Sequence, residues 1–330
     1  MKQDNLVGID VSAKELVVRM EKDGIRISLS FDNELAGHKK LLKYITKDGR
    51  KAQVCMEATG IYHFQCALYL SKSKKIKVMV INPKVIKHFG IALMQRAKTD
   101  PVDAGVILEY IKRMEFIQWQ PPADNCLQIQ AISRRICQLK EEVNRETNRR
   151  HADEYKNVLN AINKDIETSI EHLNKRIKLL EEKGIKIIHS DEKIKKCFEL
   201  LISIKGIAET SALKILAELI CMPKDMQAAQ WVAYAGLDPR PVESGSSINK
   251  PRRISKAGNK YLRAALYMPA WVAVRHDPNV KAFYDKLIAA GKKPLQAIVA
   301  VMRKLLHAIW GMLKSDSQWD GQRFYVIETA

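Results

Sequence analysis

Short apolar runs and amphipathic segments alternate along the N-terminal part of the chain. Residues 6–20 predict two strands and a turn, because the run LVGID ends in an acid and ELVVRM is rich in β-branched residues. Residues 25–31 alternate apolar with polar positions, as a half-buried third strand does. The apolar runs 52–56 and 77–81 predict two more strands, with a helical pattern at 61–70 between them. A strand meander followed by strands that alternate with helices indicates an α/β layered domain.

The middle of the chain has a different pattern. Residues 127–183 contain almost no proline or glycine, and their apolar positions recur in steps of three and four. This spacing predicts long helices that pack as a coiled coil or an antiparallel hairpin, interrupted at the polar stretch 144–154. The spacing does not distinguish packing within one chain from dimerisation. Past Gly184, short helices and glycine-containing turns predict a second domain.

Composition limits the classes of binding partner and the cellular compartment that we expect for this protein. The 56 Lys and Arg residues exceed the 37 Asp and Glu residues, and the net charge of +19 favours polyanions. Membrane surfaces also attract such a charge, but we find neither an apolar run that would span a bilayer nor an amphipathic anchor. The six cysteines lack zinc spacing and predict free thiols. Because MKQDNLVGIDVS lacks the pattern of a signal peptide, we expect a cytoplasmic protein without a membrane partner.

Four acids stand where a metal site would need them. Asp10 and Glu57 each end a predicted strand, and Asp100 and Asp103 lie three apart on one face of a helix start. Carboxylates from separate elements provide the oxygen ligands that magnesium-dependent phosphodiester chemistry requires. The four acids together therefore indicate a metal-dependent enzyme that acts on nucleic acid.

Each acid also has a structural interpretation. The sequence Asp100-Pro101-Val102-Asp103 is typical of a helix start with an N-cap, proline at the first position and an acid at the third. Asp10 could be a turn residue after a strand, and Glu57 an exposed acid. The combination of the four, rather than any single acid, supports a metal site.

Two segments of the C-terminal half favour contact with nucleic acid. Residues 200–219 predict two helices around a turn at Gly206, as in a helix-hairpin-helix DNA-binding element, although a packed helical hairpin has the same pattern. Residues 244–263 contain no acid, and six cations there suit a phosphate backbone, although a solvated basic loop is the alternative. These cations are Lys250, Arg252, Arg253, Lys256, Lys260 and Arg263.

A serine beside these cations could attack phosphorus if it lost its proton and the developing charge were stabilised. Four serines meet this chemical requirement, and the residues alone do not choose among Ser244, Ser246, Ser247 and Ser255. A lone serine in a loop is more often a turn residue than a nucleophile.

The segments GIDVSAKE, MEATGIYH, VINPKVIKHF and RAKTDPVDA occur in the order seen in the DEDD insertion-sequence transposases, which are bridge-RNA-guided recombinases. AAQWVAYAGLDPRPVESGSSI and RRISKAGNKYLRAAL resemble the C-terminal transposase domain of the same family. The resemblance implies a ribonuclease-H-like, RuvC-like α/β domain at 1–122. It also implies a long helical coiled-coil region for dimerisation at 123–190 and a mainly α transposase domain at 191–330.

The resemblance also implies roles for individual residues. Asp10, Glu57, Asp100 and Asp103 would form the tetrad that binds Mg²⁺. Ser244, the serine of the Ser-Gly pair, would attack DNA and form a transient phosphoserine link to the cut strand.

We therefore expect an RNA-guided, site-specific recombinase that cuts and rejoins donor and target DNA. Its guide RNA would come from the non-coding end of the element, and the protein would be a homo-oligomer, a dimer that assembles to a tetramer. One alternative is a Holliday-junction-type nuclease that uses the tetrad with water as the nucleophile. From other classes, GIDVSAKELVV also resembles the phosphate-gripping strands of actin-like ATPases, and a non-catalytic nucleic-acid scaffold would need no tetrad.

Overall fold

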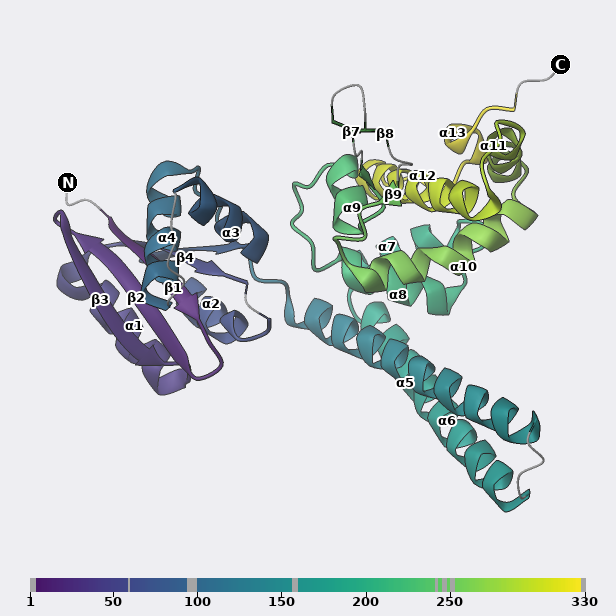
Figure 1. Ribbon diagram of the computed structural model, residues 1–330, viewed down its shortest axis with the longest axis horizontal. Coiled ribbons are helices and arrows are strands. Elements are labelled where there is room, and N and C mark those ends of the chain that lie inside the picture. The colour runs from purple at the N-terminus through teal and green to yellow at the C-terminus, as the bar shows by residue number, and fades with distance from the viewer. Residues whose placement is uncertain are drawn as a thin grey trace. The chain divides into compact units, whose positions relative to one another are not determined.

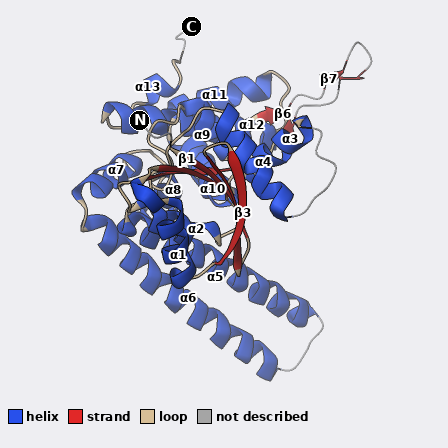
Figure 2. Ribbon diagram, turned by 90° about the vertical axis from the view of Figure 1, so that its left-hand side faces the viewer, coloured by secondary structure: helices blue, strands red, loops and turns tan. Residues whose placement is uncertain are grey.

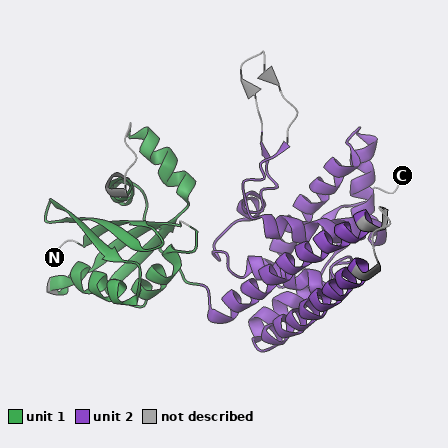
Figure 3. Cartoon of the chain, turned by 60° about the horizontal axis from the view of Figure 1, so that its bottom comes forward, with its two compact units in different colours: residues 1–121 green, residues 122–330 purple. Residues whose placement is uncertain are grey.

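The computed structural model describes residues 4–58, 60–93, 100–155, 160–240, 243–244, 248–249 and 253–327 (Figure 1). The chain folds as two compact units, Met1–Pro121 and Pro122–Ala330 (Figure 3). Unit 1 contains a mixed sheet between helices, and unit 2 is mostly helical (Figure 2). The predicted sequence of an α/β part followed by a helical part is confirmed.

The sheet of unit 1 has five strands in the order β3-β2-β1-β4-β5. They are β1 Asn5–Val11, β2 Glu15–Lys22, β3 Ile25–Asp32, β4 Ala52–Glu57 and β5 Ile76–Ile81. The first three form an antiparallel meander, whereas β1, β4 and β5 run parallel. The central strands read as nearly continuous apolar runs because both of their faces are covered.

Helices cover both faces of this sheet (Figure 1). A short 3-10 helix, Lys47–Gly49, precedes β4. On one face pack α1 Leu35–Ile45 and α2 His63–Ser71, and on the other α3 Pro83–Ala92 and α4 Asp100–Arg113. The start of α3 follows from its sequence, since the Asn82 side chain accepts a hydrogen bond from Lys84 N and Pro83 occupies the first turn.

Unit 2 begins with a helical hairpin formed by α5 Asp124–Tyr155 and α6 Asn160–His189, which lie side by side (Figure 1). The apolar seam packs within one chain in the part of α5 that contains Ile129, Ile136 and Leu139, which are fully buried, whereas Ile162 in α6 is exposed. The interruption expected at 144–154 does not occur, because α5 stays helical to Tyr155. The polar residues of that stretch lie on the distal part of the hairpin, where there is less of the molecule to cover them.

The remaining helices of unit 2 surround one core that also includes the base of the hairpin. They are α7 Glu192–Ile202, α8 Glu209–Leu219, α9 Ala228–Tyr234, α10 Lys260–His276, α11 Pro278–Ala289, α12 Pro294–Ser315 and α13 Gly321–Phe324. Between α9 and α10 lie four two-residue strands, β6 Pro239–Arg240, β7 Glu243–Ser244, β8 Ile248–Asn249 and β9 Arg253–Ile254.

Helix α12 corrects one expectation from the sequence. Within the described residues it is the one helix long and apolar enough to cross a membrane by length and composition alone. Its apolar stripe packs into the core of unit 2, where Ile298, Val301, Leu305 and Ile309 are fully buried. This burial accounts for the apolar composition of α12.

The turn between α7 and α8 depends on Gly206. Its φ is +105°, and a Cβ atom at this position would lie 2.7 Å from Ala273 N and 2.8 Å from Pro269 O in α10. Only a residue without a side chain permits this approach. Close packing on α10 therefore accounts for the glycine in the segment predicted as a helix-hairpin-helix element, as the alternative of a packed helical hairpin expects.

We predict that Gly206→Ala lowers the free energy of unfolding of unit 2 by about 2–4 kcal/mol, because it combines backbone strain with a steric clash. Urea unfolding followed by circular dichroism measures the change. Gly311→Ala in α12 is the control: among the described residues no atom lies within 4 Å of the added Cβ. It should raise stability by up to about 1 kcal/mol. Equal stability of the two variants would contradict the role of Gly206.

Candidate functional site

Asp10 and Glu57 lie at the same edge of the sheet. Strands β1 and β4 are parallel and pair Gly8 with Cys55 and Ile9 with Met56, so Asp10 and Glu57 occupy the next position on each strand. Residues in register on adjacent parallel strands point to the same face of the sheet. Both acids are partly exposed there.

Helix α4 approaches the same face very closely. A Cβ atom on Gly8 would lie 2.5 Å from Leu108 N and 2.6 Å from Ala104 O, so the backbones of β1 and α4 touch. Because side chains alternate along a strand, Gly8 and Asp10 face the same way. Asp103 adjoins Ala104 in sequence and stands four positions before the fully buried Ile107. It therefore lies on the side of α4 that faces the sheet.

The direction of α4 places its first turn beside the acids. Near its C-terminal end, Lys112 Nζ donates to Glu21 Oε2 at 2.8 Å, and Glu21 pairs with Leu6 near the start of β1. Helix α4 thus runs opposite to β1, and its first turn lies at the edge where β1 ends. Asp100 and Asp103 belong to that turn.

The backbone therefore places all four predicted ligands at one edge of the sheet. The side chain of Asp100 lies outside the described residues. Among the side chains that are described, no three His, Cys, Asp or Glu residues form a group that could hold a metal ion. The magnesium site stays a prediction; carboxylate oxygens are the donors that a hard cation prefers.

Asn33 links the segments that follow both acidic strands, a feature that the sequence did not indicate. Its Nδ2 donates to Ser12 O at 2.8 Å, two residues past Asp10, and to Tyr62 O at 3.1 Å, five residues past Glu57. Its Oδ1 accepts from Nε2 of His38, which is 3% exposed. Burial lowers the pKa of His38 and so favours the neutral ring. An asparagine just before a helix looks like an ordinary cap in sequence.

Ser244 lies in β7, opposite Ile248 in β8. A second pair of strands, β6 and β9, flanks this hairpin and pairs Arg240 with Arg253. The side chain of Ser244 lies outside the described part of the chain, as do Ser246, Ser247, Lys250 and Arg252 entirely. The backbone of Ser244 therefore belongs to a short strand pair.

The described basic residues of this region differ in their surroundings. Arg253, Lys256 and Lys260 are exposed, and Lys260 Nζ lies 5.1 Å from the ring centre of Tyr261. Arg263 is half-buried, and its Nη1 donates to Ala235 O at 2.8 Å. The three exposed cations are accessible to a phosphate backbone, whereas Arg263 also fixes the chain that leads into β6.

Ser255 has a structural role. Its Oγ donates to Asp238 Oδ1 at 2.5 Å and accepts from Ala257 N at 3.3 Å. This serine thus holds the turn between β9 and α10. The Ser255 hydroxyl, one of the four chemically possible nucleophiles, is therefore occupied by hydrogen bonds within its own turn. The side chains of the other three serines lie outside the described residues.

Comparison with known proteins gives two family matches in succession along the chain. Residues 7–153 match a DEDD transposase family of the IS110 type, described as transposase. Residues 198–285 match the transposase IS116/IS110/IS902 family. The chain carries the domains of an IS110-family transposase. It is a DNA transposase or recombinase enzyme.

Two of the similar proteins span nearly the whole chain. A pilin gene-inverting protein of Moraxella bovis is 27% identical over 318 residues, which cover 95% of this chain and 97% of the relative. The pilin gene-inverting protein of Moraxella lacunata has the same identity and coverage. A putative transposase of Sinorhizobium fredii is 37% identical over 117 residues, which cover 34% of this chain and 29% of the relative.

The cysteines of the transposase offer no alternative nucleophile. All six are free thiols, as predicted. Burial raises the pKa of Cys66 and of Cys221 to about 12, and it raises the pKa of Cys55 further. These thiols are therefore protonated near neutral pH and unreactive.

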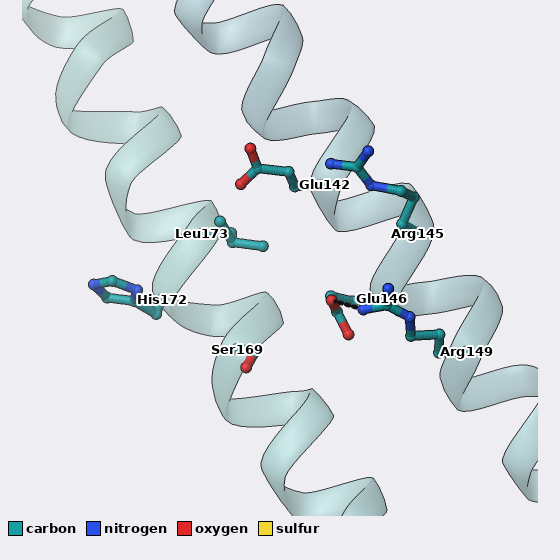
Figure 4. A pocket seen from close by; sticks show the side chains of 7 residues that line it. All are labelled: Glu142, Arg145, Glu146, Arg149, Ser169, His172 and Leu173. Atoms are coloured by element: carbon teal, nitrogen blue, oxygen red, sulfur yellow. Dashed lines mark hydrogen bonds and ion pairs between the residues drawn. The ribbon is translucent and has the colours of Figure 1, made fainter.

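A surface hollow of about 370 Å³ lies on the hairpin of unit 2 (Figure 4). It is lined by Glu142, Arg145, Glu146 and Arg149 of α5 and by Ser169, His172 and Leu173 of α6. Glu146 and Arg149 pair with each other at 2.5 Å. Because arginines and glutamates balance there, the hollow lacks the excess positive charge that a phosphate backbone needs.

We predict that Gly8→Ala lowers the transposition activity about a hundredfold, because the added methyl group pushes α4 away from β1 and shifts Asp103 relative to Asp10. Strand cleavage of element DNA by the full-length protein measures the effect. Gly105→Ala in α4 is the matched control, since among the described residues no atom lies within 4 Å of the added Cβ. Wild-type cleavage by Gly8→Ala would show that the close approach is not needed.

Proposed function

We propose that this transposase is an RNA-guided, site-specific recombinase that cuts and rejoins donor and target DNA. In this proposal Asp10, Glu57, Asp100 and Asp103 hold Mg²⁺ and Ser244 is the nucleophile. The observation that carries the proposal is the register of Asp10 with Glu57 at the edge reached by the first turn of α4. The gene-inverting relatives from Moraxella add support, since inverting a gene requires cutting and rejoining DNA.

Unit 1 would be a ribonuclease-H-like, RuvC-like domain. Its order β3-β2-β1-β4-β5, with an antiparallel meander joined to a parallel pair, agrees with that expectation. In such a sheet the acids gather where the central parallel strands end. Fold alone does not establish function, so the acids have to be tested directly.

The serine step exchanges one phosphodiester bond for another and so conserves the energy of the bond. Oγ of Ser244 attacks phosphorus, the bond from phosphorus to the departing nucleotide oxygen breaks, and the serine proton is lost while that oxygen gains one. A nucleotide hydroxyl then attacks the phosphoserine, which releases the serine and joins a new pair of strands. No bond energy is lost to water, so rejoining needs no nucleotide cofactor.

The carboxylates would bind the metal ion, and the basic segment would contact the phosphate backbone. Mg²⁺, when bound, would supply a positive charge that stabilises the charge developing on the phosphate. Asp10 and Glu57 would orient the ion from two adjacent strands, and Asp100 and Asp103 would complete its ligands. The proposed phosphate contacts are Lys250, Arg252, Arg253, Lys256, Lys260 and Arg263, of which Arg253, Lys256 and Lys260 are exposed.

The proposal includes a guide RNA and an oligomer. The RNA rests on the resemblance of the sequence segments, because phosphate electrostatics are the same for RNA and DNA. Exchange between two duplexes involves four strands, and one serine per cut strand suits a dimer that assembles to a tetramer. The protein would act in the cytoplasm, where the element DNA and the RNA are both present.

A junction nuclease that uses water is the second candidate, because the placement of the acids would serve it equally well. The two functions differ in the product: a nuclease releases free strand ends, whereas the serine enzyme stays attached to DNA.

We predict that wild-type protein with a suicide DNA substrate carries a nucleotide on Ser244, detected by mass spectrometry. Ser244→Ala should bind DNA normally and form no adduct, and Asp10→Asn should lower adduct formation on the order of 10²–10³-fold. Ser315→Ala, on an exposed serine of the same unit, is the control and should react as wild type. Free strand ends produced by Ser244→Ala would instead establish the water nuclease.

We also predict that recombination requires RNA from the non-coding end of the element. Ribonuclease treatment of the complex should abolish recombination, and adding back the RNA should restore it. Changing the RNA bases that pair with the target should redirect insertion to the complementary site. Recombination at an unchanged site after ribonuclease treatment would refute RNA guidance.

A further inference from the structure

Glu218 is a fully buried acid in the middle of unit 2. It lies in α8 and accepts two hydrogen bonds from Arg134 in α5, from Nε to Oε1 at 2.9 Å and from Nη2 to Oε2 at 2.8 Å. Gln130, one turn earlier in α5, donates to Oε2 at 3.3 Å. A buried carboxylate is tolerated only when donors compensate for its lost hydration, and here most of them come from the hairpin.

The remaining donor comes from the other side of the core. Asn259 Nδ2 donates to Glu218 Oε2 at 2.6 Å and to the Tyr234 hydroxyl at 3.1 Å, which uses both amide protons. Its Oδ1 accepts from the backbone N–H groups of Tyr261 and Leu262 and so caps α10. Every polar atom of the Asn259 side chain is therefore engaged, and one side chain joins the acid to a helix start.

The same asparagine ends the segment that contains Ser244. The backbone N–H of Asn259 donates to Tyr234 O at 2.5 Å, and a Cβ on Gly258 would lie 2.0 Å from that oxygen. The segment that leaves α9 and the segment that enters α10 are thus hydrogen-bonded and closely packed next to Glu218. Pairing of Lys256 N with Gly236 O at 3.1 Å extends this contact toward β6 and β9.

We propose that Glu218 is a positioning residue for the serine step: through Asn259 it fixes the base of the segment carrying Ser244, and through Arg134 it ties that base to α5. This inference rests on the proposed role of Ser244. Packing alone would not require a charge here, since a well-packed apolar residue can replace a buried ion pair without loss of stability. What the Glu218 side chain adds is direction, because it accepts hydrogen bonds from Arg134 in α5 and from Asn259 at the N-cap of α10.

Glu218→Gln tests the proposal in the full-length protein, because it keeps the size of the side chain and removes the charge. The rate of adduct formation on a suicide DNA substrate should fall about ten- to a hundredfold, as for a small misplacement of a reacting group. The dissociation constant for the same DNA should change by less than about threefold, since the exposed phosphate-contacting cations are untouched. Glu181→Gln is the matched control, because Glu181 pairs with Lys140 at 3.0 Å across the same hairpin. It should leave both quantities unchanged.

Amide hydrogen exchange gives a second readout that does not depend on serine chemistry. Exchange at residues 256–262 should become faster in Glu218→Gln and stay at the wild-type rate in Glu181→Gln. Asn259→Asp keeps the oxygen that caps α10 but loses the amide donors, so it should reproduce both effects if Glu218→Gln does not fold.

Three outcomes separate the possibilities. A wild-type adduct rate in Glu218→Gln would overturn the proposal. A parallel loss of adduct rate, DNA affinity and melting temperature would also overturn it, in favour of a purely structural role. If the wild-type protein forms no adduct, the proposed role of Ser244 fails by itself. In that case unchanged exchange at residues 256–262 would refute the positioning role, and faster exchange would support it.

Discussion

Parallel pairing of β1 with β4 between two helical layers is the constraint on which unit 1 depends. Covered on both faces, these strands can pair only in the register that keeps their apolar residues buried. A slip by one residue would turn Asp10 toward the opposite face. The same pairing that builds the core therefore fixes which acids share an edge, and the contact of β1 with α4 at Gly8 determines how close Asp103 can come.

Unit 2 solves a different problem, because its helices have to hold an irregular segment between α9 and α10 in place. Apolar packing gives the core its cohesion but little directional information. Hydrogen bonds at Glu218, Asn259 and Ser255 supply the direction, since each links the base of that segment to a helix or to its own opposite strand. Apolar residues thus stabilise the core of unit 2, whereas polar residues in the same core orient the segment between α9 and α10.

The sequence predicted the parts of the fold that depend on local pattern. The five sheet strands, the acids at or next to the ends of β1 and β4, and the two long helices all follow from apolar runs and their spacing. The sequence did not predict features that depend on the tertiary structure. The length of α5 was underestimated because exposed polar residues remain helical at the end of a hairpin. The apolar character of α12 was missed because Arg303 and Lys304 interrupt its run, although both stand on a helix with a fully buried stripe.

The positions of the four proposed ligands follow from the sequence, whereas the contacts of two further residues do not. Asp10, Glu57, Asp100 and Asp103 stand at ends of elements, where sequence position alone suggests chemistry. Asn33 and Glu218 act through partners far away in sequence. Asn33 reads as a residue before a helix, and Glu218 as one polar position within the apolar helix α8. Neither partner set can be inferred without the tertiary structure.

The position of α12 in the chain has a consequence for synthesis. All elements of unit 1 lie within residues 1–121, so this unit can fold while the ribosome is still translating the rest. The core of unit 2 lacks the apolar stripe of α12 until residues 294–315 have emerged. The half of the protein that carries Ser244 therefore matures last, and a chain truncated before α12 would present the acids without a properly folded serine segment.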